Sequence, residues 1–205
     1  MFYVRTFLVA SGKIFNFCQL SNNATETLLA KSRLEALARE ESVTIKKYHT
    51  DNGIFASAAF KEDCNSKKQK LTFSGVGAHH QNGVAERNIK TISQWARASM
   101  LHAAHSWPDA ASINLWPQAV DYAVWVFNHL PTLDVGVSPN ELWSRTRFPT
   151  SSLDRAHVFG CPVYVLDPKL QDGHKIPKWD PRARLGMFVG FSFSHSSLVP
   201  LVLNI

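Results

Sequence analysis

Strand and helix patterns alternate along residues 2–130, and their order constrains the fold more than any other feature of the sequence. Two segments rich in Phe, Val and Ile are joined by a Ser-Gly-Lys turn, which predicts two strands within residues 2–20. A helix is expected near residues 24–41, because Asn and Thr offer an N-cap, Glu26 falls in the first turn, and Leu and Ala dominate the segment. Period-two alternation then predicts a strand over residues 43–50.

The pattern continues with further helices and one more strand. We expect a short helix over 56–64, a brief strand over 71–75, a long helix over 82–104, a helix over 113–130 that ends at Pro131, and a loop over 132–152. The resulting order β-β-α-β-α-β-α-α indicates an α/β domain.

The long helix carries two faces. Its apolar stripe consists of Ala85, Ile89, Ile92, Ala96 and Met100. A polar face on the flank of this stripe consists of Glu86, Lys90, Ser93 and Arg97.

The composition changes after about residue 153, where strand-like segments are interrupted by Gly and Pro. We expect two domains, residues 1–150 and a small β-barrel or sheet over residues 155–205 that is cut off at its end. The second range holds six basic and three acidic residues, and the basic ones are Arg155, Lys169, Lys175, Lys178, Arg182 and Arg184.

The net charge of +6 and the pI of about 9.3 suit a polyanionic partner, although a slightly basic enzyme without such a partner remains the alternative. The three cysteines form no CxxC pair, which supports neither a disulfide framework nor a zinc knuckle. We expect no membrane association, because no apolar run approaches the length of a bilayer span.

Asp51 directly follows the strand predicted over residues 43–50, in the phrase "YHTDNGIF". Asn-Gly is a strong hairpin signal, but a hairpin needs a second strand, and the residues after Gly53 are typical of a helix. Ligands of α/β sheets gather beyond the carboxyl ends of strands. We therefore favour Asp51 as a site residue, with a simple turn as the alternative.

Glu86 begins the polar face of the long helix. By itself it could be a solvated residue or a favourable charge in a first turn. Lys90 and Arg97 follow on the same face, and a carboxylate that binds a metal ion beside cations that hold phosphates suits a nucleic-acid strand. The i, i+4 spacing also permits a plain salt bridge between Glu86 and Lys90.

Adjacent histidines, His79 and His80, invite a zinc hypothesis, but neighbours in a loop rarely face one ion and no cysteine pair accompanies them. We favour a loop beside the site. Four tryptophans are expected to pack in the core, with stacking on bases as the alternative: Trp107, Trp116, Trp125 and Trp143.

Several uncommon phrases occur in one order: "YHTDNGIF", "LTFSGVGAHHQNGVAERNIKTISQWARASMLHA", "LWPQAVDYAVWVFNHLP" and "SPNELW". In them the sequence resembles the integrase catalytic core of copia-type retrotransposon polyproteins. The tail "FGCPVYVLDPKLQDGHKIPKWDPRARLGMFVGFS" resembles the small β-barrel segment that follows this core. The resemblance covers nearly all of the chain and implies a ribonuclease-H-like mixed sheet flanked by helices.

The resemblance also implies a function, which is the joining of element DNA to target DNA by a Mg²⁺- or Mn²⁺-dependent strand transfer. In such enzymes two Asp and one Glu hold two divalent ions, which clamp the attacking and leaving oxygens. Asp51 matches the second Asp and Glu86 matches the Glu. DNA as partner, a homo-oligomer and a nuclear location are implied in the same way. The expected nucleic-acid contacts are Lys90, Arg97, Lys175, Lys178, Arg182 and Arg184.

The first Asp of the resemblance has no counterpart. Its place falls near residues 7–9, with Leu8 as the best match, and no Asp or Glu occurs in residues 1–20. Leucine cannot bind Mg²⁺, and Glu26 on the next helix would have to reach back. We therefore expect an integrase core that is inactive in this chain. The alternatives are a DNA- or RNA-binding module without catalysis and a non-functional relic of a transposable element.

Overall fold

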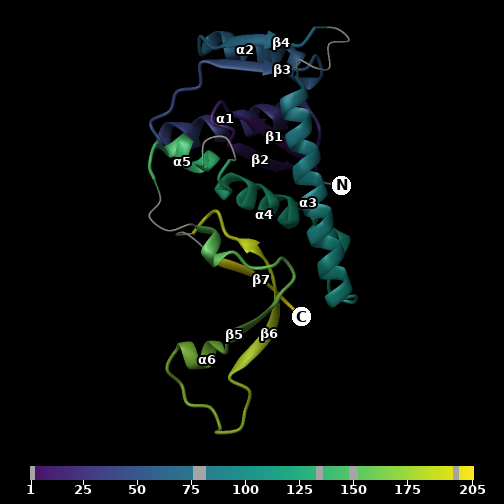
Figure 1. Ribbon diagram of the computed structural model, residues 1–205, viewed down its shortest axis with the longest axis vertical. Helices are drawn as coiled ribbons and strands as arrows, with labels where there is room; N and C mark the ends of the chain where they lie inside the picture. Colours follow the sequence, from purple (N-terminus) through teal and green to yellow (C-terminus); the bar gives the residue numbers. More distant parts are fainter. Residues whose placement is uncertain (1–2, 76–81, 133–135, 148–151, 196–198) are drawn as a thin grey trace. The chain divides into compact units, whose positions relative to one another are not determined.

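The computed structural model describes residues 3–75, 82–132, 136–147, 152–195 and 199–205 (Figure 1). The chain forms two compact units, Met1–Ile92 with Phe127–Arg147, and Ser93–Val126 with Phe148–Ile205. Two of the three boundaries between these units fall inside helices, namely α3 (Gly83–Ser106) and α4 (Trp116–His129). The units therefore differ from the ranges 1–150 and 155–205, which stay a prediction about domains.

A hairpin opens the first unit. Strand β1 (Tyr3–Leu8) pairs antiparallel with β2 (Ile14–Gln19), with Leu8 opposite Ile14. The Val9 N–H donates to the Lys13 carbonyl at 3.0 Å, and Gly12 has a φ of 83°. A three-residue hairpin loop needs a residue in this left-handed conformation, and glycine adopts it without steric cost.

A helix follows the hairpin, and after it come two parallel strands with the crossover that connects them. Helix α1 (Ala24–Glu40) begins at Asn23, whose side chain accepts a hydrogen bond from the Glu26 N–H at 2.8 Å. Strands β3 (Lys47–Thr50) and β4 (Lys70–Phe73) are parallel, and the short 3₁₀ helix η1 (Ile54–Ala56) and helix α2 (Ala58–Ser66) connect them. Parallel strands require such a crossover.

The four strands of the first unit form two separate two-stranded sheets in the described part of the chain, β1 with β2 and β3 with β4. A shared core joins them: Phe7, Ala30, Leu34, Tyr48, Phe60 and Cys64. The rings of Phe7 from β1 and Tyr48 from β3 meet edge to face, with centroids 6.4 Å apart. Helix α1 contributes Ala30 and Leu34 to this core, which both strand pairs share.

Helix α5 (Pro139–Ser144) lies where a loop was expected, so that prediction is wrong for these six residues. Ser138 and Glu141 form a capping box, in which each side chain accepts a hydrogen bond from the other residue's backbone N–H. The Ser-x-x-Glu spacing is a known signature of a helix start. The signal was therefore present in the phrase "SPNELW".

The second unit contains a three-stranded antiparallel sheet of β5 (Pro162–Leu166), β6 (Ala183–Phe191) and β7 (Pro200–Asn204). The short helix α6 (Pro168–Gln171) follows β5, and the short 3₁₀ helices η3 (Ile113–Leu115) and η4 (Ser152–Arg155) precede α4 and β5. An aromatic cluster packs α4 against β6: Tyr122, Trp125, Phe159, Phe188 and Phe191. We expected a small β-barrel or sheet here; the described residues form a three-stranded sheet, and a barrel stays a prediction.

None of the helices in the described part of the chain is both long and apolar enough to cross a membrane.

Candidate functional site

Asp51 directly follows β3, at the carboxyl end of a parallel strand. The hairpin interpretation of Asn-Gly is excluded, because η1 and α2 follow and the partner strand β4 runs parallel. The Asp51 carboxylate accepts a hydrogen bond from the Gly53 N–H at 3.4 Å. The Asn52 side chain donates to the Ser74 carbonyl beyond β4 at 3.1 Å, which fixes the turn. The exposed carboxylate of Asp51 therefore belongs to a turn that the Asn52–Ser74 hydrogen bond holds to the residues after β4.

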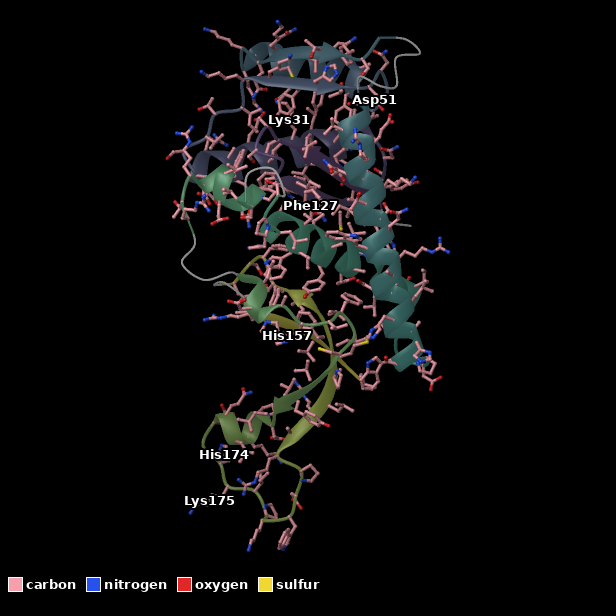
Figure 2. The ribbon with its side chains drawn as sticks, viewed as in Figure 1. Lys31, Asp51, Phe127, His157, His174 and Lys175 are labelled. Carbon is pink, nitrogen blue, oxygen red and sulfur yellow. The ribbon has the colours of Figure 1, made fainter. Side chains whose placement is uncertain are left out.

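A groove of about 630 Å³ runs between β1 and β3 within the first unit. Its lining includes Asp51 and, from the start of α3, Val84 and Ala85. Figure 2 shows Asp51 beside the N-terminal end of α3. The structure thus brings Asp51 to the same groove as the helical turn that carries Glu86, whose own side chain is exposed.

Leu8, at the carboxyl end of β1, lines the same groove. The nearest charge on this strand is basic. The Arg5 guanidinium lies 5.0 Å from the Phe55 ring centroid, and burial lowers its pKa although the negative charge of Asp51 opposes this effect. The groove therefore combines a half-buried cation with the Asp51 carboxylate.

A two-ion magnesium centre does not fit this set of side chains. Mg²⁺ takes hard oxygen ligands in a near-octahedral arrangement, and two ions share several carboxylates. No group of three His, Cys, Asp or Glu side chains that could hold a metal ion occurs among the described residues. His79 and His80 lie outside the described part of the chain, so the zinc hypothesis stays untested.

The polar face of α3 is solvent-exposed at Glu86, Lys90 and Arg97. No ion pair joins Glu86 to Lys90 within the described ranges. The salt-bridge alternative is therefore not observed, and both cations can contact an anionic ligand.

Four predicted nucleic-acid contacts lie together in the second unit, between α6 and the start of β6. We call this segment, residues 172–184, the basic arm; its cations are Lys175, Lys178, Arg182 and Arg184, all exposed. Figure 2 shows Lys175 toward the end of the arm away from the sheet. The Lys178 ammonium lies 5.1 Å from the Trp179 ring centroid, and Trp179 is 87% exposed. Sequence reasoning missed Trp179, although a tryptophan within "KIPKWDPRAR" was a visible signal.

Comparison with known proteins finds a relative by sequence and similar chains among solved structures. No family profile matches the sequence. The chain is 30% identical over 155 residues, 75% of its length, to the retrovirus-related Pol polyprotein from transposon TNT 1-94 of Nicotiana tabacum. It spans only 11% of that polyprotein.

Among solved structures, the chain is similar to one in the simian T-cell lymphotropic virus intasome in complex with PP2A regulatory subunit B56 gamma. The TM-score is 0.51 and the identity 16%, over 99% of this chain and 74% of that one. The HTLV-2 integrase catalytic core domain in complex with magnesium gives a TM-score of 0.49 and 20% identity, over 69% of this chain and 92% of that one.

The fold is thus the α/β fold of retroviral integrase cores. These matches confirm the resemblance of the sequence: the chain is similar to part of a retrovirus-related transposon Pol polyprotein, and its fold is similar to that of a chain in a retroviral intasome.

Proposed function

We propose that this chain binds nucleic acid as the core of a retrotransposon integrase and does not by itself transfer DNA strands. The observation that supports this proposal is the groove: Asp51 and the first turn of α3 line it, while the described residues offer no third metal-binding side chain beside them. The described residues thus offer a surface for the substrate but do not supply three clustered metal donors for the chemistry.

Exposed cations support the binding part of the proposal. Lys90 and Arg97 lie on one face of α3, and the basic arm adds four more cations beside an exposed tryptophan. Lysine and arginine contacts to phosphates release counterions, so that the binding constant falls as salt rises. Magnesium is not needed for such binding, since the cations themselves neutralise the phosphates.

Salt-dependent binding to a labelled DNA duplex, followed by fluorescence anisotropy, tests this function. We expect log K to fall linearly with log[salt], with a slope of about −0.9 for each phosphate contact. Replacing Lys175, Lys178, Arg182 and Arg184 by Gln should reduce the slope by up to about 3.6.

A control variant with Arg33→Gln and Arg147→Gln removes exposed cations outside the proposed surfaces. This control variant should keep most of the slope of log K against log[salt]. Absence of binding at low salt, or equal losses in both variants, would contradict the proposal. An RNA duplex of the same length measured in parallel decides between DNA and RNA as the preferred partner.

The expected self-association and nuclear location extend the same proposal. Sedimentation of the chain with and without DNA measures the first, and imaging of a tagged full-length chain in cells measures the second.

A further inference from the structure

A two-stranded ribbon extends beyond the three-stranded part of the sheet in the second unit. Strand β5 pairs with β6 over its whole length, and Tyr164 lies opposite Leu185. Strand β7 pairs with β6 only from Gly186 onward. In the described part of the chain, residues 183–185 therefore have β5 as their only strand neighbour, and Figure 1 shows β5 and β6 leading to α6. We call residues 164–166 and 183–185 the β5–β6 ribbon.

One face of the β5–β6 ribbon is apolar and exposed. Residues that lie opposite each other in an antiparallel pair share a face, and successive residues alternate between the two faces. Tyr164, Leu166 and Leu185 therefore lie on one face, and all three are exposed, with Tyr164 at 74%. Arg184 pairs with Val165 and belongs to the other face. The ribbon thus presents an aromatic ring on one face and a cation on the other.

The exposed positions of β5 do not follow the usual pattern of a strand at a surface. Antiparallel strands commonly carry polar residues on their solvated face, yet the exposed residues of β5 are Pro162, Tyr164 and Leu166. Farther along β6 the apolar side chains are covered, since Met187 and Phe188 are fully buried. Neighbouring apolar side chains that stay exposed beside such a core indicate an interaction surface.

Cations begin where the apolar face ends. The Arg182 carbonyl accepts a hydrogen bond from the Asp167 N–H at 2.9 Å, which joins the basic arm to the end of β5. The Asp167 carboxylate accepts a hydrogen bond from the Lys169 N–H at 2.9 Å and caps α6. Arg182 and Arg184 are exposed, and neither forms an ion pair within the described ranges. Both guanidinium groups are therefore available to an anionic ligand.

The chemistry of the ribbon fits a polymer of planar groups and anions. Each nucleic-acid base has a π-face that can stack on an aromatic side chain, as in many proteins that bind single strands. In a duplex the bases stack on each other, and only their edges are accessible in the grooves. The apolar face offers the Tyr164 hydroxyl as its one hydrogen-bonding side-chain group for reading such edges. It therefore suits unpaired bases better than a duplex groove.

We propose that the β5–β6 ribbon binds single-stranded nucleic acid, with a base stacked on the ring of Tyr164. Leu166 and Leu185 contact the same strand beside this base, and Arg182 and Arg184 hold its phosphates. The inference rests on the proposed function and deepens it, because it names the form of nucleic acid that the second unit takes and adds an aromatic contact to the cations. DNA and RNA single strands share the base faces and phosphates that the ribbon recognises.

Fluorescence anisotropy with a labelled oligothymidylate of about twelve nucleotides tests this proposal on the full chain. Tyr164→Ala should weaken binding about fivefold or more, because the stacked base loses its partner. Tyr164→Phe keeps the ring and should bind almost as tightly as the unchanged chain. Tyr164→Leu keeps an apolar side chain without a ring, and it should lose about as much affinity as Tyr164→Ala.

A control variant and a second readout make the test specific. Tyr3→Ala removes another exposed tyrosine, on β1 of the first unit, and should leave the affinity unchanged. All variants at Tyr164 should keep the thermal midpoint, because this side chain is largely exposed. Irradiation of an oligonucleotide that carries a photoreactive halogenated uracil should attach it within residues 162–166, where mass spectrometry of the digested adduct locates it.

Duplex binding on the same samples separates this inference from the proposed function. Tyr164→Ala should leave the duplex affinity almost unchanged, because the cations of the basic arm remain. Absence of duplex binding by the unchanged chain would contradict the proposed function. Equal affinity of Tyr164→Ala and the unchanged chain for the single strand would instead overturn the role of the ribbon alone.

Three further results would overturn the proposal. The first is no binding of the single strand by the unchanged chain, and the second is an equal loss on single strand and duplex in Tyr164→Ala. The third is self-association without nucleic acid that Tyr164→Ala abolishes in sedimentation, which would assign the apolar face to a second copy of the chain.

Discussion

The side chain of Asn128 makes the backbone hydrogen bonds to Ile14 that a neighbouring strand would otherwise make. Its side-chain amide accepts a hydrogen bond from the Ile14 N–H and donates one to the Ile14 carbonyl, each at 2.8 Å and across 114 positions of sequence. Both residues are buried. The outer edge of β2 is therefore satisfied at this point by α4, whereas β1 has no strand partner besides β2 among the described residues.

Asn128→Ala should destabilise the first unit by about 1–3 kcal/mol for each buried backbone group left unpaired. Chemical denaturation with a probe in that unit measures the loss. Asn114→Ala, at an exposed position, is the control and should stay within about 0.5 kcal/mol. Equal stability of the two variants would mean that water replaces the Asn128 amide without cost.

Lys31 is the centre of a buried ion network. Its ammonium is fully buried and donates to Glu35 at 2.6 Å, Asp63 at 2.5 Å and Gln69 at 2.7 Å. We expect Lys31→Met to cost about 3–5 kcal/mol, because it leaves carboxylates without their buried partner. Thermal and chemical denaturation measure this loss.

Lys67→Met is a matched control, since Lys67 pairs with the same two carboxylates but is 39% exposed. Its loss should stay below about 1 kcal/mol. A loss at Lys67 as large as that at Lys31 would show that burial does not set the strength of this network.

Low pH should reduce the free energy of unfolding, because it protonates Glu35. Burial by itself would raise the pKa of this carboxyl, but hydrogen bonds from Lys31, Lys67 and Gln69 outweigh it and lower the pKa from 4.5 to about 2. The folded state thus favours the carboxylate. Stability from this group is fully present above about pH 5 and is lost as the pH falls toward 2, by at most about 3 kcal/mol.

Denaturation between pH 7 and 2 checks this dependence. Glu35→Gln should flatten the acid limb in part only, because the same network also lowers the pKa of Asp63 against the effect of its burial. If Glu35→Gln lost as much stability between pH 5 and pH 2 as the unchanged chain, Glu35 would not be a source of the acid sensitivity.

Trp179→Ala should weaken binding to single-stranded DNA about fivefold or more and leave duplex binding almost unchanged. An aromatic ring that stacks on a base contributes about 1–3 kcal/mol, and bases are accessible to it in single strands. Ile113→Ala, which removes another highly exposed apolar side chain of the same unit, should change neither affinity. Equal losses on both substrates would exclude stacking as the role of Trp179.

Much of the secondary structure followed from local pattern. The helix expected over 82–104 is observed as Gly83–Ser106, because its apolar stripe and polar face repeat with helical period over its whole length. Asp51 was also located correctly at a strand end, because Gly53 is followed by a helical segment rather than a strand.

What depends on distant contacts could not be predicted. Lys31 looks like a surface residue of a helix, since lysine is almost never buried without a partner. Its partners Asp63 and Gln69 come from more than thirty positions away and meet it only in the folded unit. The groove beside Arg5 likewise arises from the placement of β1 against β3, which no local pattern encodes.

The most direct test of the central claim is a strand-transfer assay with a labelled DNA end, in Mg²⁺ and in Mn²⁺. Leu8→Asp, Asp51→Asn and Glu86→Gln are run beside the unchanged chain, and duplex binding is measured on the same samples. We predict that the unchanged chain binds duplex DNA but gives no joined product with either metal ion. A joined product from the unchanged chain that disappears in Asp51→Asn would contradict the account.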